Sequence, residues 1–497
     1  MSAGPHVTQD WIVGLTVTSE PVAEDSEQPP SISQLEEAVA ADPTDLETLK
    51  ALAEAYRISG DFDAALDAWE KVLAVNPTYQ RGLSRLVAVG ARGSMDWPRI
   101  WRAVRELEPL KKGSSPYRNP TLRRQLDALF AGDHLTGPQP SVEEAASIVE
   151  TLEEMGQNGR HLKPTTVTLV LMCLQFAGHF SLGFRLRMLS QQRRIAQSFM
   201  RPPGENLSAL RNLLKALVYT GSPETAAQLS RMQHWAKDDP QAQRRLQKMH
   251  ADALLMAGRA EPYCAYAEAV REQAPLPGED RMSELVTGKR VAVVGPADTG
   301  DRLGELIDSY DVVVRPRYQP EFLAAHPETM GSRTDIAYYS GFDMDEFLAQ
   351  AEEAVDRGDL QLVNARPFTH ATHAHLGHRW LRFYRQDYSL CPAGGQLGIQ
   401  RMTYDLLQFR PAEIAIFNSD FYTGSQMFTA GWRPQDRFGP GSHINDIVAA
   451  HDIRFDFAFT QALMKTGTVT AQGQAAEVLA MSVSEYEAAV EAAGVLR

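Results

Sequence analysis

Cysteine, long apolar runs and positive charge are all scarce in this sequence of 497 residues. The three cysteines, Cys173, Cys264 and Cys391, are odd in number and far apart, which excludes a disulfide framework and a cysteine-based metal knuckle. No apolar run approaches the roughly 20 residues that span a bilayer, so no integral membrane segment is expected. The formal net charge of −14 argues against a general binder of nucleic acid or anionic membranes.

The start of the chain also lacks the features of a secretory leader. The sequence MSAGPHVTQDW has neither a basic beginning nor an apolar centre, and together with the unpaired cysteines it predicts a cytoplasmic protein. Residues 1–30 become rich in Glu, Pro and Ser near their end, which predicts a flexible tail. With 43% hydrophobic and 23% charged residues, the composition is that of a globular protein, and the length predicts at least two domains.

A period of 34 residues marks the first half of the chain. Asp42-Pro43-Thr44 recurs as Asn76-Pro77-Thr78, which is the period of a tetratricopeptide repeat. Gly60 is expected to form the tight turn between two helices, and Ala65 to let them approach closely. Degenerate copies of this turn are expected at three later glycines: Gly178, Gly221 and Gly258. We therefore predict an α-solenoid over residues 31–277, a stack that offers a concave face to a partner protein.

Strands and helices alternate after the linker at Leu276 to Asp280. This alternation predicts a mostly parallel sheet with helices on both faces. The predicted fold class is therefore α plus α/β, with the solenoid followed by a Rossmann-like domain over residues 285–497. The expected strands are Arg290–Gly295, Asp311–Arg315, Asp335–Tyr339, Leu360–Ala365 and Glu413–Phe417, with a helix at Gln396–Phe409.

The first of these strands ends in a glycine loop. Gly295, Ala297 and Gly300 imitate the fingerprint of dinucleotide-binding folds, although a glycine that merely turns the chain would look the same. An NAD site also needs an acidic residue after the second strand, where this chain has Arg315 and Arg317 instead. Arginines at that point suit the additional phosphate of NADP or the phosphate of a nucleotide sugar.

The segment from Val291 to Arg317 resembles more closely the large motif of sialyltransferases, glycosyltransferase family 29. It begins with a buried AVVG-like strand and continues with the GELIDSYD run from Gly304 to Asp311, and a G-S-K-T-like tetrapeptide follows at Gly331 to Thr334. The resemblance implies a glycosyltransferase that moves sialic acid or a related 2-keto-3-deoxy acid sugar from a CMP-activated donor to a glycan acceptor, with inversion. It implies no further cofactor and no metal.

Two later segments extend the resemblance. Pro392-Ala393-Gly394-Gly395 and the helix after it resemble the family's smaller motif, and backbone N–H groups of such a loop suit the anionic or ribose end of a nucleotide. The sequence from His451 resembles the family's last motif, in which a histidine is followed five residues later by an acid, here Asp456. The resemblance implies that both are catalytic, with His451 as the general base. Asp452 is expected to cap a helix from Ile453, whose positive end favours a neutral imidazole.

The implied donor site combines the two glycine loops with residues near strand ends. Its members are Gly295, Pro296, Ala297, Arg315, Arg317, Pro392, Ala393, Gly394, Gly395, Tyr422 and His443. Pro296-Ala297 stands where the family usually has Asn-Ser, and Ala393-Gly394 where it has Ser-Thr. Two alternatives therefore stay open: an NADP-dependent oxidoreductase on a dinucleotide fold, and a helical-repeat scaffold with an inactive transferase domain.

Two other polar clusters are not expected to bind metal. Four histidines lie close together, but no cysteine or acidic residue joins them, so they are expected to line the acceptor side of a cleft or to lie in a solvated loop. They are His370, His373, His375 and His378. Asp343 and Asp345 resemble a D-x-D metal clamp, but their context predicts the start of a helix.

Overall fold

A computed structural model describes most of the chain, apart from the N-terminal tail and several loops. The described residues are 30–90, 93, 95–107, 119–132, 139–157, 164–232, 234–339, 341–365, 378–385, 387–432, 447–448 and 451–494. The chain forms two compact units. The first comprises Met1–Ser190, Gln435–His451 and Arg497, and the second comprises Gln191–Pro434 and Asp452–Leu496.

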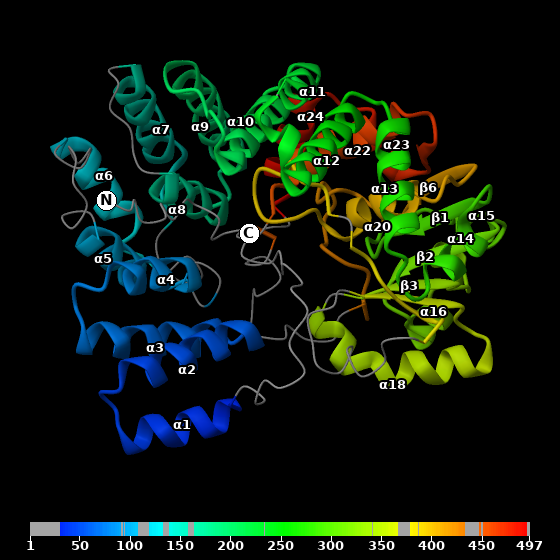
Figure 1. Ribbon diagram of the computed structural model, residues 1–497, viewed down its shortest axis with the longest axis horizontal. Helices are drawn as coiled ribbons and strands as arrows, with labels where there is room; N and C mark the ends of the chain where they lie inside the picture. The colour runs from blue at the N-terminus through cyan, green and yellow to red at the C-terminus, as the bar shows by residue number, and fades with distance from the viewer. Residues whose placement is uncertain are drawn as a thin grey trace. The chain divides into compact units, whose positions relative to one another are not determined.

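The first unit is built from successive helices, which Figure 1 shows from blue to teal. Gly60 joins two of them with a φ of 85°, in the left-handed region where a side chain is unfavourable. Ala65 and Trp69 are buried beside it, so the two helices approach closely, as the sequence predicts. The helices are α1 (Ile32–Ala41), α2 (Leu46–Ser59), α3 (Phe62–Val75), α4 (Gln80–Gly90), α5 (Trp97–Leu107), α6 (Pro120–Leu129), α7 (Val142–Gln157), α8 (Pro164–Phe176) and α9 (Phe180–Met200), the last of which runs into the second unit.

The same left-handed turn recurs at the three later glycines that the sequence analysis identified. Gly178, Gly221 and Gly258 have φ values of 85°, 84° and 80°, and each joins two consecutive helices. These predictions are confirmed. The helices of the second unit that precede its sheet are α10 (Leu207–Tyr219), α11 (Pro223–Arg231), α12 (Pro240–Met256), α13 (Glu261–Gln273) and α14 (Glu279–Val286), with a 3-10 turn at His234–Asp238.

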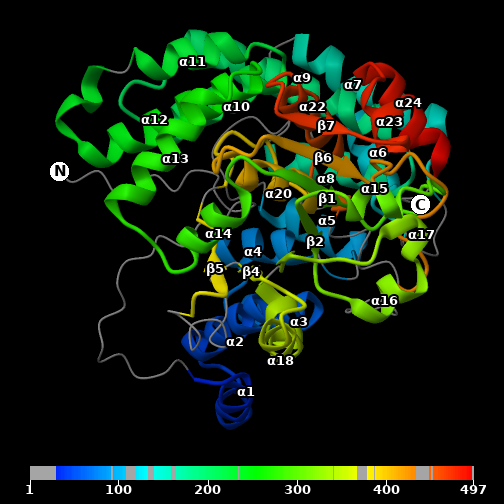
Figure 2. The ribbon, with the colours of Figure 1, turned by 90° about the vertical axis from the view of Figure 1, so that its right-hand side faces the viewer.

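The second unit contains a sheet in which every neighbouring pair of described strands is parallel. The strand order is β5-β4-β3-β2-β1-β6-β7, and Figure 2 shows β7, β6, β1 and β2 following one another. The parallel sheet predicted from the sequence is confirmed, with β5 and β7 as short additional edge strands. The strands are β1 (Arg290–Val294), β2 (Val312–Pro316), β3 (Ile336–Tyr338), β4 (Leu362–Ala365), β5 (Leu381–Phe383), β6 (Glu413–Phe417) and β7 (Val469–Ala471).

Helices cover this sheet. Ala292 and Val294 of β1 pack into an apolar core with Ile307 and Met330, which come from short helices after β1 and β2. Helix α20 packs against β1 and β6, and α22 packs against α20 and β7. The helices of this part are α15 (Gly304–Asp308), α16 (Pro320–Ala325), α17 (Pro327–Met330), α18 (Gly341–Arg357), α20 (Gly398–Leu407), α22 (Ile453–Met464), α23 (Gln474–Leu479) and α24 (Val483–Ala493).

A buried polar network ties α12 to α20. Lys248 donates to the Asp252 carboxylate at 2.6 Å and also bonds the hydroxyl of Tyr404. That hydroxyl donates to Asp252 at 2.7 Å, and Ser389 donates to Asp252 through its N–H and its Oγ. Burial lowers the pKa of Lys248, and it raises the pKa of Tyr404 well above its ordinary value. Because buried charges need partners, this network fixes α12 to α20. Helix α20 in turn packs against the sheet.

A second buried pair lies close to this network. Arg382 of β5 donates to both carboxylate oxygens of Asp405 in α20, at 2.6 and 2.9 Å, and both side chains are completely buried. Tyr338 donates its hydroxyl to the same carboxylate at 2.6 Å. The alternating strands begin at Arg290, after α14, and helices α10 to α14 belong to the same compact unit as the sheet.

Candidate functional site

The carboxyl ends of β1 and β6 meet at the point where the strand order reverses. The chain passes outward from β1 through β2 to β5 on one side, and then continues with β6 and β7 on the other. Parallel sheets leave a crevice at such a point, and ligands commonly bind there. The two strand ends are directly bonded, because Gly295 donates its N–H to Phe417 O at 2.9 Å and Ala297 donates to Asn418 O at 3.2 Å.

Gly295 is surrounded by three elements of this edge. A Cβ atom at this position would lie 2.3 Å from the Asn418 carbonyl oxygen and 3.2 Å from Cδ1 of Ile399, in the first turn of α20. Pro296, the next residue, accepts from the N–H and the hydroxyl of Thr429, at 2.8 and 3.0 Å. The loop after β1, the end of β6 and the N-terminus of α20 therefore lie together.

Replacing Gly295 with alanine is expected to lower the free energy of unfolding by about 1–3 kcal/mol, because the new methyl group overlaps a backbone carbonyl that cannot rotate away. The control is Gly398→Ala at the first residue of α20, where a Cβ would meet nothing within 4 Å. That change should leave stability unchanged or raise it by up to about 1 kcal/mol. Urea unfolding of both variants measures the difference, and equal stabilities would contradict the close packing at Gly295.

Residues after β2 and β6 adopt backbone conformations that side chains disfavour. Arg317 has a φ of 72°, and Asn418, Phe421 and Tyr422 have φ values of 47°, 50° and 66°. Each such residue costs on the order of 1–3 kcal/mol, and such strain tends to cluster at functional sites. The carboxylate of Asp420 supports the loop after β6 by accepting the N–H groups of Tyr422 and Gly424, at 3.0 and 3.1 Å, and burial raises its pKa.

The loop Pro392–Gly395 is half-buried and leads into the N-terminus of α20. Gly394 takes a left-handed φ of 50°. Leu397 gives no side-chain cap to the first N–H groups of α20, and Nε2 of the buried Gln396 has no hydrogen-bond partner in the described part of the chain. Unsatisfied donors at a helix N-terminus suit an anion or a ribose oxygen.

The first turn of α22 lies beside the loop after β6, because the hydroxyl of Tyr486 donates to Phe421 O at 2.9 Å and to Ile453 O at 3.4 Å. Asp452 caps this helix as predicted, and its Oδ1 accepts the N–H of Phe455 at 3.0 Å. His451 is half-buried, immediately before the cap in the chain, and donates its N–H to Ile447 O. His443, also predicted for the donor site, lies outside the described residues.

Asp456 is 2% exposed, and its carboxylate faces the backbone N–H of Leu397, the residue before α20. Burial, reinforced by the charge of Asp452, raises its pKa well above the ordinary value. The neighbouring thiol of Cys391 is affected in the same way, since burial and the charge of Asp456 raise its pKa. These groups lie close to the N-termini of α20 and α22, so the predicted catalytic acid lies beneath the site rather than on its surface.

This burial predicts a pH dependence of stability. Because the pKa of Asp456 is higher in the folded protein than in the unfolded chain, the folded state binds the extra proton, and stability should fall as pH rises above about 4. Asp456→Asn removes this titration, so the variant should gain stability over the parent at pH 7 and gain less at pH 4. Thermal melts across this range measure the effect. The account of Asp456 would be wrong if the gain did not depend on pH.

The two predicted arginines differ in their surroundings. Arg315 is 3% exposed and donates to Arg333 O at 2.9 Å and to Met330 O, and burial lowers its pKa to about 10. Its guanidinium is thus engaged by two backbone carbonyls. Arg317 follows β2, donates its N–H to Tyr338 O at 2.9 Å and places its guanidinium 5.3 Å from the centre of the Phe347 ring. Arg317 is the more accessible charge of the two.

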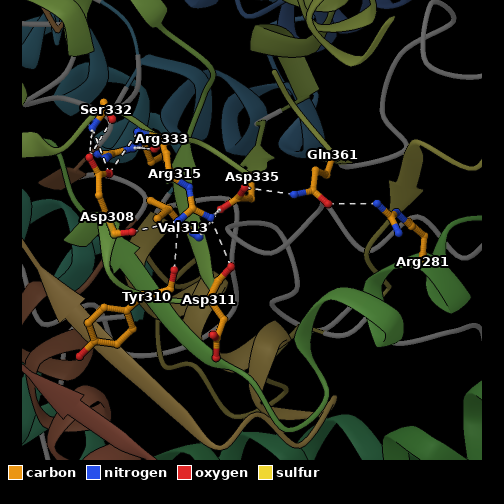
Figure 3. Close-up of polar contacts among 10 residues, drawn as sticks. All are labelled: Arg281, Asp308, Tyr310, Asp311, Val313, Arg315, Ser332, Arg333, Asp335 and Gln361. Carbon is orange, nitrogen blue, oxygen red and sulfur yellow. Dashed lines mark hydrogen bonds and ion pairs between the residues drawn. The ribbon is translucent and has the colours of Figure 1, made fainter. Parts of the chain in front are cut away.

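Asp308 and Arg333, from the two segments that resemble the sialyltransferase motif, bond mainly to backbone groups, as Figure 3 shows. The carboxylate of Asp308 accepts from the N–H and the hydroxyl of Ser332 and from the N–H of Arg333. The guanidinium of Arg333 in turn donates to Asp308 O and Tyr310 O, and lies 2.9 Å from Asp335 Oδ2. These contacts hold the segments before β2 and β3 together. Asp308 and Arg333 therefore stabilise the fold.

Three polar residues at this edge of the sheet are not among the site residues predicted from the sequence: Gln396, Asn418 and Asp420. Asn418 donates to Thr329 O at 3.1 Å, while its own buried Oδ1 has no partner among the described residues. The run Asn-Ser-Asp directly after a buried apolar strand was the available signal. In the described part of the chain, no three His, Cys, Asp or Glu side chains are arranged to hold a metal. His370, His373 and His375, and the side chains of Asp343 and Asp345, lie outside the described residues.

Comparison with known proteins identifies one part of the chain. Residues 25–90 match the family described as Tetratricopeptide repeat, which confirms the predicted repeat in that segment. No curated protein matches the chain. Within the described residues, no helix has both the length and the apolar character needed to span a membrane.

Proposed function

We propose that the second unit is a glycosyltransferase that uses a CMP-activated acid sugar. The substrate class is sialic acid or a related 2-keto-3-deoxy acid, transferred to a glycan hydroxyl with inversion. The observation that carries the proposal lies at the reversal of strand order, where the glycine loop after β1 packs against Asn418 and against Ile399 of α20, the helix that the second glycine loop precedes. These are the two loops that resemble the donor-binding motifs of sialyltransferases.

The proposed reaction is a single displacement. The acceptor hydroxyl loses its proton to His451 and its oxygen forms a bond to the anomeric carbon, while the bond from that carbon to the phosphate oxygen breaks and CMP departs. Rate enhancement then depends on alignment and on stabilising the departing phosphate. The side-chain amide of Gln396, just before α20, and the charge of Arg317 are the groups of this chain that suit that phosphate.

The glycine loop itself favours a nucleotide sugar over a dinucleotide. In dinucleotide folds the loop after the first strand runs directly into a long helix, whose N-terminus holds the pyrophosphate. Here β1 ends at Val294, α15 begins only at Gly304, and α15 has 5 residues. The N-terminus that lies beside Gly295 belongs instead to α20, the helix preceded by the second glycine loop.

Thermal melting of the full chain with CMP, UMP, GDP and NADP, each at the same concentration, tests the proposal. CMP is expected to raise the melting temperature most, since a ligand at 100 times its dissociation constant stabilises by about 2.7 kcal/mol. A larger effect of NADP would favour the oxidoreductase alternative. The scaffold alternative predicts no hydrolysis or transfer of CMP-sialic acid even where CMP binds.

A further inference from the structure

Acidic residues are missing from a long stretch of this otherwise acidic chain. The protein has 63 Asp and Glu residues, but none lies between Met155 and Gly204. Within that stretch, Arg185 of α9 pairs with Glu153 and Arg187 is buried. The positive charge that remains on α9 therefore lies toward its C-terminal end. It comes from Arg193, Arg194 and Arg201.

Two large apolar side chains project from the same end of α9. Phe199 is 83% exposed and Met200 is 84% exposed, the highest values among the large apolar residues of the described chain. Side chains that keep more than four-fifths of their surface contact almost nothing, so this end of the helix is convex. Adjacent exposed apolar residues of this size are typical of an interaction site.

The charged and apolar side chains share neighbouring stripes of the helix. Arg193 and Met200 are seven residues apart and lie on one stripe, and Arg194 and Arg201 lie on the next. Arg201 follows α9 directly and continues its pattern, because its N–H bonds the carbonyl oxygen one turn back at 2.9 Å. All these residues belong to the second unit. We call Arg193, Arg194, Phe199, Met200 and Arg201 the arginine tip.

The charges of the arginine tip oppose one another. Burial and the charge of Arg194 lower the pKa of Arg193 to about 10, and burial lowers the pKa of Arg194. In the orientation that satisfies its amide, Gln197 accepts from Nε of Arg193 at 3.1 Å, but this neutral partner does not offset the charge. The first acid after the tip, Glu205, comes four residues beyond Arg201. An anionic surface would relieve this repulsion.

We propose that the arginine tip docks the second unit on an anionic lipid surface. The apolar side chains enter the boundary between headgroups and acyl chains, and the guanidinium groups bond lipid phosphate and carboxylate oxygens. The formal net charge of −14 does not cancel this attraction. Electrostatic forces are screened beyond about 8 Å at physiological ionic strength, so the charges nearest the lipid decide it.

The shape and the composition of the tip favour lipid over other occupants. A convex surface suits a membrane, whereas peptides bind in grooves or along sheet edges. Two copies that met tip to tip would bring their arginines together, and like charges that face one another oppose association. Single-stranded nucleic acid binds by stacking successive bases on aromatic rings, but Phe199 is followed by the aliphatic side chain of Met200.

Co-sedimentation of the full chain with sucrose-loaded vesicles tests the proposal. Vesicles of phosphatidylcholine with about 30% phosphatidylserine should bind the protein at least about 10-fold more tightly than phosphatidylcholine alone. Phe199→Ser/Met200→Ser should weaken binding to the mixed vesicles at least about 10-fold. The matched control is Ile58→Ser/Val142→Ser, where the side chains are 58% and 56% exposed. Its affinity should stay within about twofold of the parent.

Two further variants separate charge from insertion. Arg193→Gln/Arg201→Gln should reduce binding to the mixed vesicles to the level of phosphatidylcholine alone, and added salt should weaken the parent much more than this variant. Pro202→Cys, labelled with the fluorophore NBD, places a reporter directly after the tip, and the three native cysteines are buried. Its emission should rise with the mixed vesicles, because NBD fluoresces more strongly in an apolar environment.

Equal binding of both vesicle types, equal losses in the two serine double variants, or unchanged NBD emission would overturn the proposal. Binding of an eight-nucleotide oligouridylate that Phe199→Ser/Met200→Ser abolishes would assign the tip to nucleic acid instead. A dimer of the parent that the same variant dissociates would assign it to a second copy. The melting temperature of this variant and its shift with CMP should match those of the parent, so the outcome does not depend on the proposed transferase function.

Discussion

Replacing Arg382 with methionine should lower the free energy of unfolding by about 3–5 kcal/mol, because it leaves the carboxylate of Asp405 buried without its cation. Both side chains are completely buried, and two hydrogen bonds of 2.6 and 2.9 Å join them. The pair also connects β5 to α20, so its loss should weaken the sheet edge and the helix that carries the second glycine loop. Urea unfolding followed by circular dichroism measures the change.

Two further variants make this result specific. Arg379→Met removes an ion pair at 3.0 Å to Asp280, but that arginine is 68% exposed, so its loss should cost at most about 1 kcal/mol. Arg382→Met/Asp405→Leu removes both buried charges and should be less destabilised than Arg382→Met alone. A double variant as unstable as the sum of the single changes would show that the pair is not coupled.

His451→Ala should lower the rate of transfer from CMP-sialic acid by about 10²–10⁴-fold, the usual contribution of a general base, while CMP affinity changes little. The reason is that His451 directly precedes the Asp452 cap of α22, at the position that the resemblance to sialyltransferases gives to the general base of the proposed reaction. Single-turnover transfer and CMP melting shifts, measured on the same preparation, separate the two effects.

The control for this experiment is His250→Ala, since His250 lies in α12 with its Nδ1 3.0 Å from Ala227 O and belongs to no predicted site. Its turnover should equal that of the parent. Full transfer activity in His451→Ala, or an equal loss in both variants, would remove His451 from the mechanism.

Local patterns predicted the elements of this fold well. The left-handed glycines at Gly60 and Gly258 and the cap at Asp452 depend on residues close in sequence, and the structure has all three. Strands β5 and β7 were not predicted, and their place in the sheet comes from pairing with β4 and β6. The packing of α12 on α20 through Lys248 and Tyr404 depends on residues far apart in the chain, so no local pattern indicates it.

At the candidate site, too, features set by local sequence could be predicted, and features set by contacts between distant residues could not. Gly295 and the loop before α20 are recognisable because a close approach and a helix N-terminus impose local sequence requirements. Arg315 looked like a phosphate ligand in the sequence, and only the folded chain shows that the Met330 and Arg333 carbonyls engage it. The left-handed backbone of Asn418 lies where its carbonyl oxygen packs against Gly295, a contact between the residues that follow β6 and β1, and no local pattern indicates it.

Hydrogen exchange of the full chain with and without CMP tests most directly whether a nucleotide binds where β1 and β6 end. CMP should slow exchange in three peptides that cover residues 295–303, 392–400 and 418–424, and should leave the edge strand β5 unchanged. Gly398→Ala should show the same protection and Gly295→Ala should lose it. Protection confined to other segments, or none at saturating CMP, would contradict the proposed site.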